Sequence, residues 1–383
     1  MTETLNATDT AKRPSMVPPI IGLIAVATAF GFYAVKRHHT VTLAWEQQFS
    51  TGPSHAAIII QNDAVYAYGG WALPQIFPIN GSSPSLLAAT DLRIGSTRIP
   101  MDAGYVQENG SIFFKVPGKS KGLIAIPKTS NSRPQAGAVV RNGTDTVGIF
   151  CWAGPFVTVS HSYSLHGNVV PVKGRAVTKL VLSPASAQAA IASVDGTVAI
   201  LSAPTWQPTR TISTTGAEDI AFSASGDLFV GAGGGVTVYP RSGGASPSTI
   251  GSGIPLSAIA VSPDGELLAI ARMQSSMFRR EAEIDVYDVG TQKLLGTFNV
   301  QARASENYAG PTAMTFDPSG QMLAIGTQGE IVHVFRWRQK DEIFVTPPLG
   351  AAIQSVYMNE TQLAVMDSSG SIGVASYDLA SNR

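Results

Sequence analysis

Side chains able to bind a metal ion or a phosphate group are few in this sequence. His161 and His166 lie five residues apart near Tyr163, but no third ligand stands nearby, and zinc sites use three or four protein ligands. Residues 231–235 read Gly-Ala-Gly-Gly-Gly but join two apolar segments with no lysine after them, so a hairpin turn is favoured over a nucleotide loop. We expect polar loop histidines, no metal, no cofactor and no catalytic residues.

Two segments of the second half carry side chains suited to binding another protein. Residues 272–283 and 301–308 combine arginine, methionine and aromatic residues, a mixture enriched in the buried centres of protein interfaces. The residues expected to contact a partner are Arg272, Met273, Met277, Phe278, Arg279, Arg280, Arg303 and Tyr308. The alternative is that both segments are solvated loops that differ in length.

A weaker candidate is segment 333–340, which reads His-Val-Phe-Arg-Trp-Arg-Gln-Lys. Its aromatic and basic residues alternate. A strand with one buried face produces the same alternation, and this interpretation is favoured over a binding surface.

One structural unit recurs through residues 178–380. Residues 180–184, 220–226, 259–265 and 314–320 each place an apolar strand before a turn, for example Ile-Ala-Val-Ser-Pro-Asp-Gly at 259–265. The turn residues Ser183, Ser223, Ser262 and Asp317 follow one another at intervals of about 40 residues, with one longer step of about 55. Such a period, filled with β-type segments, is typical of the blades of a β-propeller.

The unit at 178–212 divides into four predicted strands. They cover residues 179–182, 189–192, 197–201 and 209–212, and Asp195 and Gly196 form a tight turn between the second and the third. The other clear units are 217–250, 256–300, 312–350 and 352–380. Asp195, Asp264 and Asp317 stand in turns, where their side chains are expected to accept backbone hydrogen bonds.

Residues 259–270 and 284–298 together resemble a WD repeat or the related bacterial YVTN-type repeat, with Tyr287 and Asp288 in place of the terminal Trp-Asp pair. The resemblance extends to residues 314–337, is fair at 178–250 and is poor before residue 172. The Gly-His pair that begins a full WD repeat is absent. The resemblance implies a ring-shaped scaffold for protein interactions, usually without catalysis.

The propeller is predicted to occupy residues 56–380 with seven blades, or eight as the alternative, since residues 56–172 hold two or three degenerate units. The last unit lacks an outer strand of its own. Residues 41–49, within a connector at 36–55, are expected to supply that strand and close the ring, which removes exposed sheet edges. Because strands alternate in direction within a blade, segments 272–283 and 301–308 should emerge on the same face.

Composition narrows the range of partners. Lysine plus arginine equals aspartate plus glutamate at 26 each, so no overall positive field favours nucleic acid. Only 14% of the residues are charged, as is common in exported bacterial proteins. The single cysteine, Cys151, excludes an intramolecular disulfide, and its apolar surroundings predict a buried, unreactive thiol.

Residues 16–35 contain no charged side chain and are long enough to cross a bilayer as a helix. An uncleaved signal-anchor after a polar tail, residues 1–15, is favoured over a cleavable signal peptide ending at Ala27–Ala29, because the apolar run continues beyond that site. A short tail of this kind usually stays in the cytoplasm, which would put the propeller on the periplasmic side.

The sequence therefore predicts a membrane-anchored all-β propeller, attached to the lipid bilayer through residues 16–35. It would serve as a protein-interaction scaffold, possibly as a subunit of a larger membrane or envelope complex, and would not bind nucleic acid. The alternative is a propeller enzyme or small-ligand-binding protein that uses the mouth of the central channel.

Overall fold

The structure is a computed structural model. It describes the strands between residues 39 and 171, residue 172, and residues 176–377. Within this last range, residues 184–187, 243–244, 252, 254, 273–280 and 303–309 are not described. The chain divides into two compact units, Met1–His38 and His39–Arg383, and every described residue belongs to the second. All regular elements in these described parts are β-strands.

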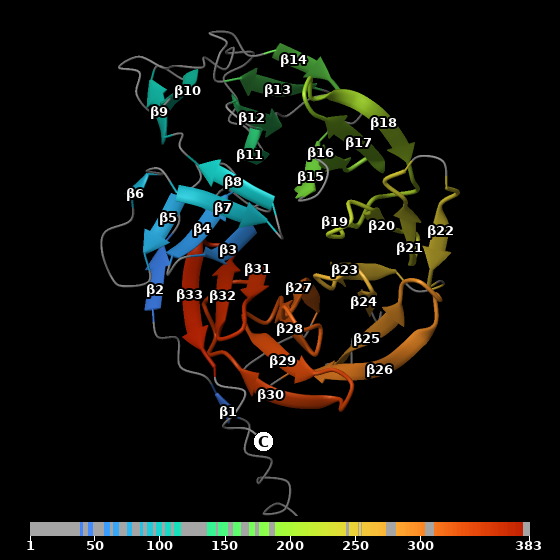
Figure 1. Ribbon diagram of the computed structural model, residues 1–383. Coiled ribbons are helices and arrows are strands. Elements are labelled where there is room, and N and C mark those ends of the chain that lie inside the picture. The colour runs from blue at the N-terminus through green and yellow to red at the C-terminus, as the bar shows by residue number, and fades with distance from the viewer. Residues whose placement is uncertain are drawn as a thin grey trace, which may run out of the picture. The chain divides into compact units, whose positions relative to one another are not determined.

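Five blades follow one another along residues 177–376, so an all-β propeller fold is confirmed (Figure 1). Consecutive strands within each blade pair antiparallel. The first two blades are β15 (Val177–Ser183), β16 (Gln188–Ser193), β17 (Thr197–Ser202) and β18 (Gln207–Ser213), then β19 (Asp219–Phe222), β20 (Leu228–Ala232), β21 (Gly235–Tyr239) and β22 (Ser248–Ile250).

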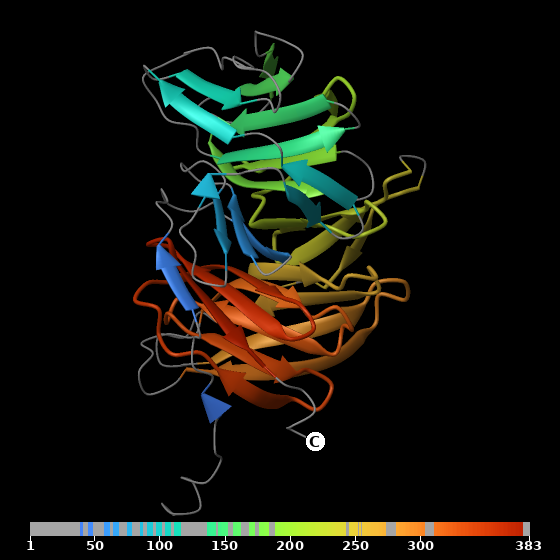
Figure 2. The same cartoon turned by 60° about the vertical axis from the view of Figure 1, so that its left-hand side comes forward.

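The next two blades are β23 (Leu256–Val261), β24 (Leu267–Arg272), β25 (Glu281–Asp288) and β26 (Leu294–Gln301), then β27 (Pro311–Phe316), β28 (Met322–Thr327), β29 (Val332–Arg336) and β30 (Asp341–Val345). A short parallel strand, β1 (His39–Thr40), adds to β30. Figure 2 shows the sheets of β27–β30 and β31–β33 from another side, in orange to red.

The fifth blade has three strands from the C-terminal end of the chain and one from near its start. Its own strands are β31 (Ile353–Met358), β32 (Gln362–Asp367) and β33 (Ser371–Ser376). The fourth is β2 (Trp45–Gln48), which pairs antiparallel with β33 through Trp45 opposite Val374. β2 lies inside the range 41–49 in which the sequence places this strand.

Burial follows each strand's position in its blade. The second strands are buried along almost their whole length, as in β24 and β28, because both faces of the blade pack against neighbouring blades. The outer strand β18 alternates between exposed and partly buried residues over most of its length. Alanine, valine, leucine and isoleucine fill the interfaces; Ala190 and Val198 of the first blade pack with Ile220 and Val230 of the second. Stability therefore comes from stacking blade on blade.

The repeated turn between first and second strands is held by its own side chains. Ser262 Oγ accepts a hydrogen bond from the Leu267 backbone N–H at 2.8 Å, and Asp317 Oδ1 accepts one from Met322 N–H at 2.7 Å. Gly265, with φ +80°, closes the Ser-Pro-Asp-Gly turn in the left-handed region that favours glycine. The predicted role of the turn aspartates is confirmed at Asp317, and also at Asp195, whose Oδ1 accepts from Thr197 N–H at 3.1 Å.

The predicted number of blades is wrong: the sequence predicts seven or eight, and the described part of the chain shows five. Earlier in the chain lie two more four-stranded sheets and two hairpins. The sheets are β3 (Ala57–Gln61), β4 (Ala64–Tyr68), β5 (Gln75–Pro78) and β6 (Ser85–Leu86), and β11 (Ala136–Asn142), β12 (Asp145–Cys151), β13 (Phe156–His161) and β14 (Asn168–Pro171). The hairpins are β7 (Thr90–Ile94) with β8 (Thr97–Met101), and β9 (Gly104–Glu108) with β10 (Ser111–Lys115).

The physical reason for this difference lies in the turns. Residues 56–172 contain strands but lack the Ser/Asp turn that recurs after residue 178. A blade count based on chain length alone therefore includes blades that the repeated pattern does not predict. The two early four-stranded sheets pack against the last and the first of the five blades. Ile58 and Val65 join Met366 and Val374 in one cluster, and Ile149 joins Leu201 in another.

Across the parts of the chain that are described, no helix has the length and apolar character needed to cross a membrane. The predicted span, residues 16–35, and the polar tail before it lie outside the described residues.

Candidate functional site

The two long connections of the third blade begin at the same end of its sheet. Antiparallel pairing sets Arg272 opposite Glu283 and Glu281 opposite Gln301. The end of β24, the start of β25 and the end of β26 therefore lie together. Segment 273–280 links the first two of these points, and segment 302–310 leads from the third to β27 of the next blade. Seven of the predicted partner-binding residues, all except Arg272, lie outside the described residues: Met273, Met277, Phe278, Arg279, Arg280, Arg303 and Tyr308.

Arg272, the eighth, is the last residue of β24 and is buried, with 4% of its surface exposed. Its Nε donates to Asp285 Oδ2 at 2.7 Å, and Asp285 is itself buried. Nη2 reaches the Tyr287 hydroxyl at 3.2 Å, and Nη1 donates to the carbonyl of Gly234, in the preceding blade, at 3.1 Å. The guanidinium thus joins two blades at the base of segment 273–280.

The electrostatics of this cluster keep the arginine charged. Burial by itself lowers the pKa of Arg272, but hydrogen bonds and charge attraction from Asp285 and Tyr287 outweigh it, so the pKa is raised. Burial raises the pKa of Tyr287. Thr297 Oγ1 donates to the second carboxylate oxygen of Asp285 at 2.7 Å. The cluster is a satisfied ion pair, which suits a structural role.

A second candidate site is a cavity of about 440 Å³ between the first strands of the five blades. β15, β19, β23, β27 and β31 all contribute to its wall. Four of these strands carry a β-bulge at the second residue. The bulged positions, and the equivalent residue before β19, are all polar and all line the cavity: Thr178, Glu218, Ser257, Thr312 and Gln354.

Sequence reasoning missed this polar ring, although a local signal exists. Each member stands five residues before the turn residue of its unit, as Ser257 does before Ser262 and Thr312 before Asp317. Two members bond directly to the next blade. Thr312 Oγ1 donates to the Ile353 carbonyl at 2.5 Å, and Glu218 Oε2 accepts from Leu256 N–H at 3.4 Å. The ring therefore combines contacts between blades with a polar cavity wall.

Among the described residues that line the cavity, the charged ones are Lys179, Glu218 and Asp219. Lys179 forms an ion pair with Asp219 Oδ1. Asp219 also accepts from Ile220 N–H at 2.8 Å and, through Oδ2, from Ile259 N–H of the next blade at 2.9 Å. Both oxygens of Asp219 are thus occupied, whereas Glu218 has only its long contact to Leu256 N–H among the described residues.

The glycine segment and the two histidines named in the sequence analysis form no binding site among the described residues. The glycine segment is a hairpin turn, as predicted, with Gly233 and Gly234 at φ +61° and +83° between β20 and β21. His161 ends β13, while His166 and Tyr163 lie outside the described residues. Among described side chains, no three of the His, Cys, Asp or Glu type gather as metal ligands.

Residues 333–336 of this segment belong to the strand β29, as predicted, but residues 337–340 form the turn before β30, and the strand is buried on both faces instead of one. His333 is fully buried and bonds Glu342 through Nδ1 at 2.6 Å, and Phe335 is also buried. Trp337 is buried too and donates to the Gly320 carbonyl at 2.8 Å, while the exposed Arg338 stacks over its ring. The segment is therefore buried in its blade up to Phe335, with Trp337 buried after it, and its alternating sequence does not mark one exposed face.

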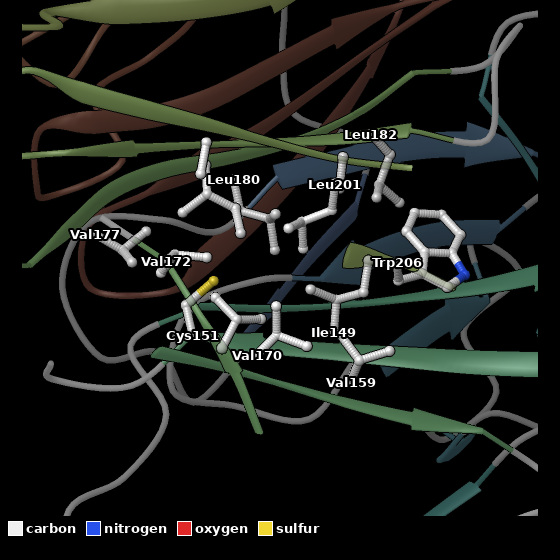
Figure 3. Packing of buried hydrophobic residues seen from close by; sticks show 14 of the residues in the cluster. Ile149, Cys151, Val159, Val170, Val172, Val177, Leu180, Leu182, Leu201 and Trp206 are labelled. Atoms are coloured by element: carbon white, nitrogen blue, oxygen red, sulfur yellow. The ribbon is translucent and has the colours of Figure 1, made fainter. Parts of the chain in front are cut away.

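Cys151 is buried in the cluster that Figure 3 shows, beside Val170 and Val172, as predicted. Burial raises the pKa of its thiol to about 12, so the nucleophilic thiolate is scarce at neutral pH. We expect a disulfide exchange reagent such as Ellman's reagent to label almost none of the native protein at pH 8, and one thiol per chain in denaturant. Rapid labelling of the folded protein would contradict this burial.

In comparisons with known proteins, no family profile and no curated sequence matches this chain. The propeller fold therefore stands on the structure, and the resemblance of residues 259–298 to a WD repeat stays a prediction from those residues.

Proposed function

We propose that this protein is a scaffold for protein–protein interaction and that segments 273–280 and 303–308 form its partner surface. The observation that carries this proposal is that both connections begin at the same end of the third blade. The strand ends from which they start belong to a paired sheet, in which Arg272 is fixed through Asp285 and Gly234. Loops on a rigid support bind with a smaller entropy loss than free segments do.

The side chains of the two segments fit this role. Phe278, Arg279 and Arg280 are adjacent in sequence, and Met273 and Met277 precede them. Aromatic residues and arginine supply most interface hot spots, and methionine adapts its shape to an uneven surface. A β-propeller commonly serves as an interaction scaffold, so the general role and the local composition agree.

A pull-down from detergent-solubilised membranes tests this surface. The variant carries Phe278→Ala, Arg279→Ala and Arg280→Ala. We expect partner recovery to fall about tenfold or more, because hot-spot residues contribute about 2 kcal/mol or more each.

The matched control changes Lys293, Leu294 and Leu295 to alanine at the other end of the same blade, where all three are exposed. This control should retain the partner. Equal partner recovery from both variants would contradict the proposal that segments 273–280 and 303–308 form the partner surface.

We also propose that residues 16–35 anchor the protein in a membrane and that the propeller lies on the periplasmic side, as part of a larger complex. The uncharged span and its basic flanks support this. Protease added to spheroplasts should then digest the propeller while a cytoplasmic control protein survives. Digestion only after lysis would place the propeller on the cytoplasmic side instead. Recovery of the protein in the soluble fraction without detergent would contradict the membrane anchor.

A further inference from the structure

The cavity between the five first strands has the size and lining of a small-molecule site. Its volume of about 440 Å³ lies within the range of ligand pockets, about 300–1,000 Å³. Val181, Ala221, Phe222, Val261 and Met314 contribute partly buried apolar residues to its wall. Ligand pockets usually combine such a wall with a few polar groups that fix orientation.

The charge of the wall is unbalanced. Lys179 and Asp219 neutralise one another in their ion pair. Among the described residues of the wall, Glu218 is then the one charged residue without an oppositely charged neighbour, so its ionised form gives this part of the wall a negative charge. The negative potential of an ionised Glu218 would attract a cation into the cavity.

Among the described residues, Glu218 has no close partner for its charge. Its contact with Leu256 N–H is 3.4 Å long, beyond the usual range for an N–H···O hydrogen bond. Burial raises the pKa of this carboxyl, and the Leu256 hydrogen bond opposes the rise only in part. A bound positive charge would stabilise the carboxylate where the protein's own groups do not.

Two hydroxyls flank Glu218 at the equivalent positions of the adjoining strands. Thr178 Oγ1 and Ser257 Oγ are buried and have no hydrogen-bond partner among the described residues. An unpaired buried hydroxyl is unfavourable, and rotation about its Cα–Cβ bond can turn it toward a new partner. Each is thus a candidate acceptor for a ligand N–H.

We propose that this cavity binds a primary ammonium group on a short apolar chain, with Glu218 as its counter-charge. The apolar wall residues surround the chain, and Thr178 and Ser257 accept the remaining ammonium protons. A metal ion fits less well, because one surplus carboxylate supplies too few anionic oxygens. The same chemistry is found in a free alkylamine and in a lysine side chain of another protein.

Titration with n-butylammonium tests the proposal on the full chain in detergent micelles, followed through the ¹³C-methyl signal of Met314 in the cavity wall. Saturable shifts are expected for butylammonium, but not for n-butanol or butyrate, which have the same chain without the positive charge. Glu218→Gln should weaken binding about tenfold or more, since a hydrogen bond to a charged group contributes about 1.5–3 kcal/mol. Glu360→Gln, an exposed carboxylate outside the cavity, should leave the affinity unchanged.

A capped Gly-Lys-Gly peptide separates the two sources of the ammonium group. Binding of both butylammonium and the peptide assigns the cavity to a lysine side chain, and binding of butylammonium alone assigns it to a free amine. Equal shifts with butanol, unchanged affinity in Glu218→Gln, or no saturable shift of Met314 would each overturn the proposal. None of these outcomes depends on the partner surface proposed above.

Discussion

Replacing Asp285 by alanine is expected to lower the free energy of unfolding by about 3–5 kcal/mol, the usual cost of removing one member of a buried ion pair. The structure explains why the effect is large. Arg272 is 4% exposed and Asp285 6%, so the guanidinium would remain buried without this carboxylate, while its bonds to the Gly234 carbonyl and the Tyr287 hydroxyl are neutral. Urea denaturation followed by circular dichroism measures the change, as a lower midpoint with an unchanged slope.

The double variant Arg272→Met with Asp285→Leu is the control for this experiment. Apolar residues of similar volume often replace a buried ion pair without loss of stability, so most of the stability should return. A single variant within about 1 kcal/mol of the wild type, or a double variant as unstable as the single one, would contradict a paired and desolvated Arg272.

Trp206→Ala is expected to cost a similar amount, about 3–5 kcal/mol, because it removes a large side chain from a packed interior. Trp206 is completely buried between β17 and β18 and packs against Ile149 and Val159 of the neighbouring sheet (Figure 3). It therefore joins the first blade to the sheet of β11–β14. Alanine has the same Cβ at this position's φ of +54°, so the difference measures packing and not backbone strain.

Trp206→Phe separates ring packing from the indole N–H. No described residue accepts a hydrogen bond from Trp206 Nε1, and phenylalanine removes that unpaired donor while it keeps an aromatic ring. We expect this variant to lose less than half of what the alanine variant loses, measured by thermal unfolding. Equal losses in the two variants would show that the ring itself contributes little to this interface.

The repeat could be found from the sequence because it is local. Predicted strands at 189–192 and 197–201 agree with β16 and β17 to within about one residue, and Gly196 has the positive φ expected of the turn. The Ser-Pro-Asp-Gly signal at 262–265 is equally local, since Ser262 bonds a backbone N–H five residues later. Patterns of this kind need only neighbouring residues, so one sequence is sufficient.

The features that sequence reasoning missed depend on distant residues. Arg272 was expected in an exposed surface, but Gly234 lies 38 residues before it and in another blade. Only the folded arrangement brings that carbonyl and Asp285 to the guanidinium. The blade count failed for a related reason, because residues 56–172 carry strands without the repeated turn. The 40-residue repeat predicts further blades only where the repeated turn sequence is present.

Cross-linking from within segment 273–280 tests the proposed function most directly. A photoreactive p-benzoylphenylalanine replaces Phe278 in one variant and Leu294, exposed at the opposite end of the same blade, in the other. Irradiation of native membranes should give a discrete adduct with a partner protein at position 278 and none at position 294. No adduct at position 278, or the same adduct at both positions, would contradict a partner surface at this end of the propeller.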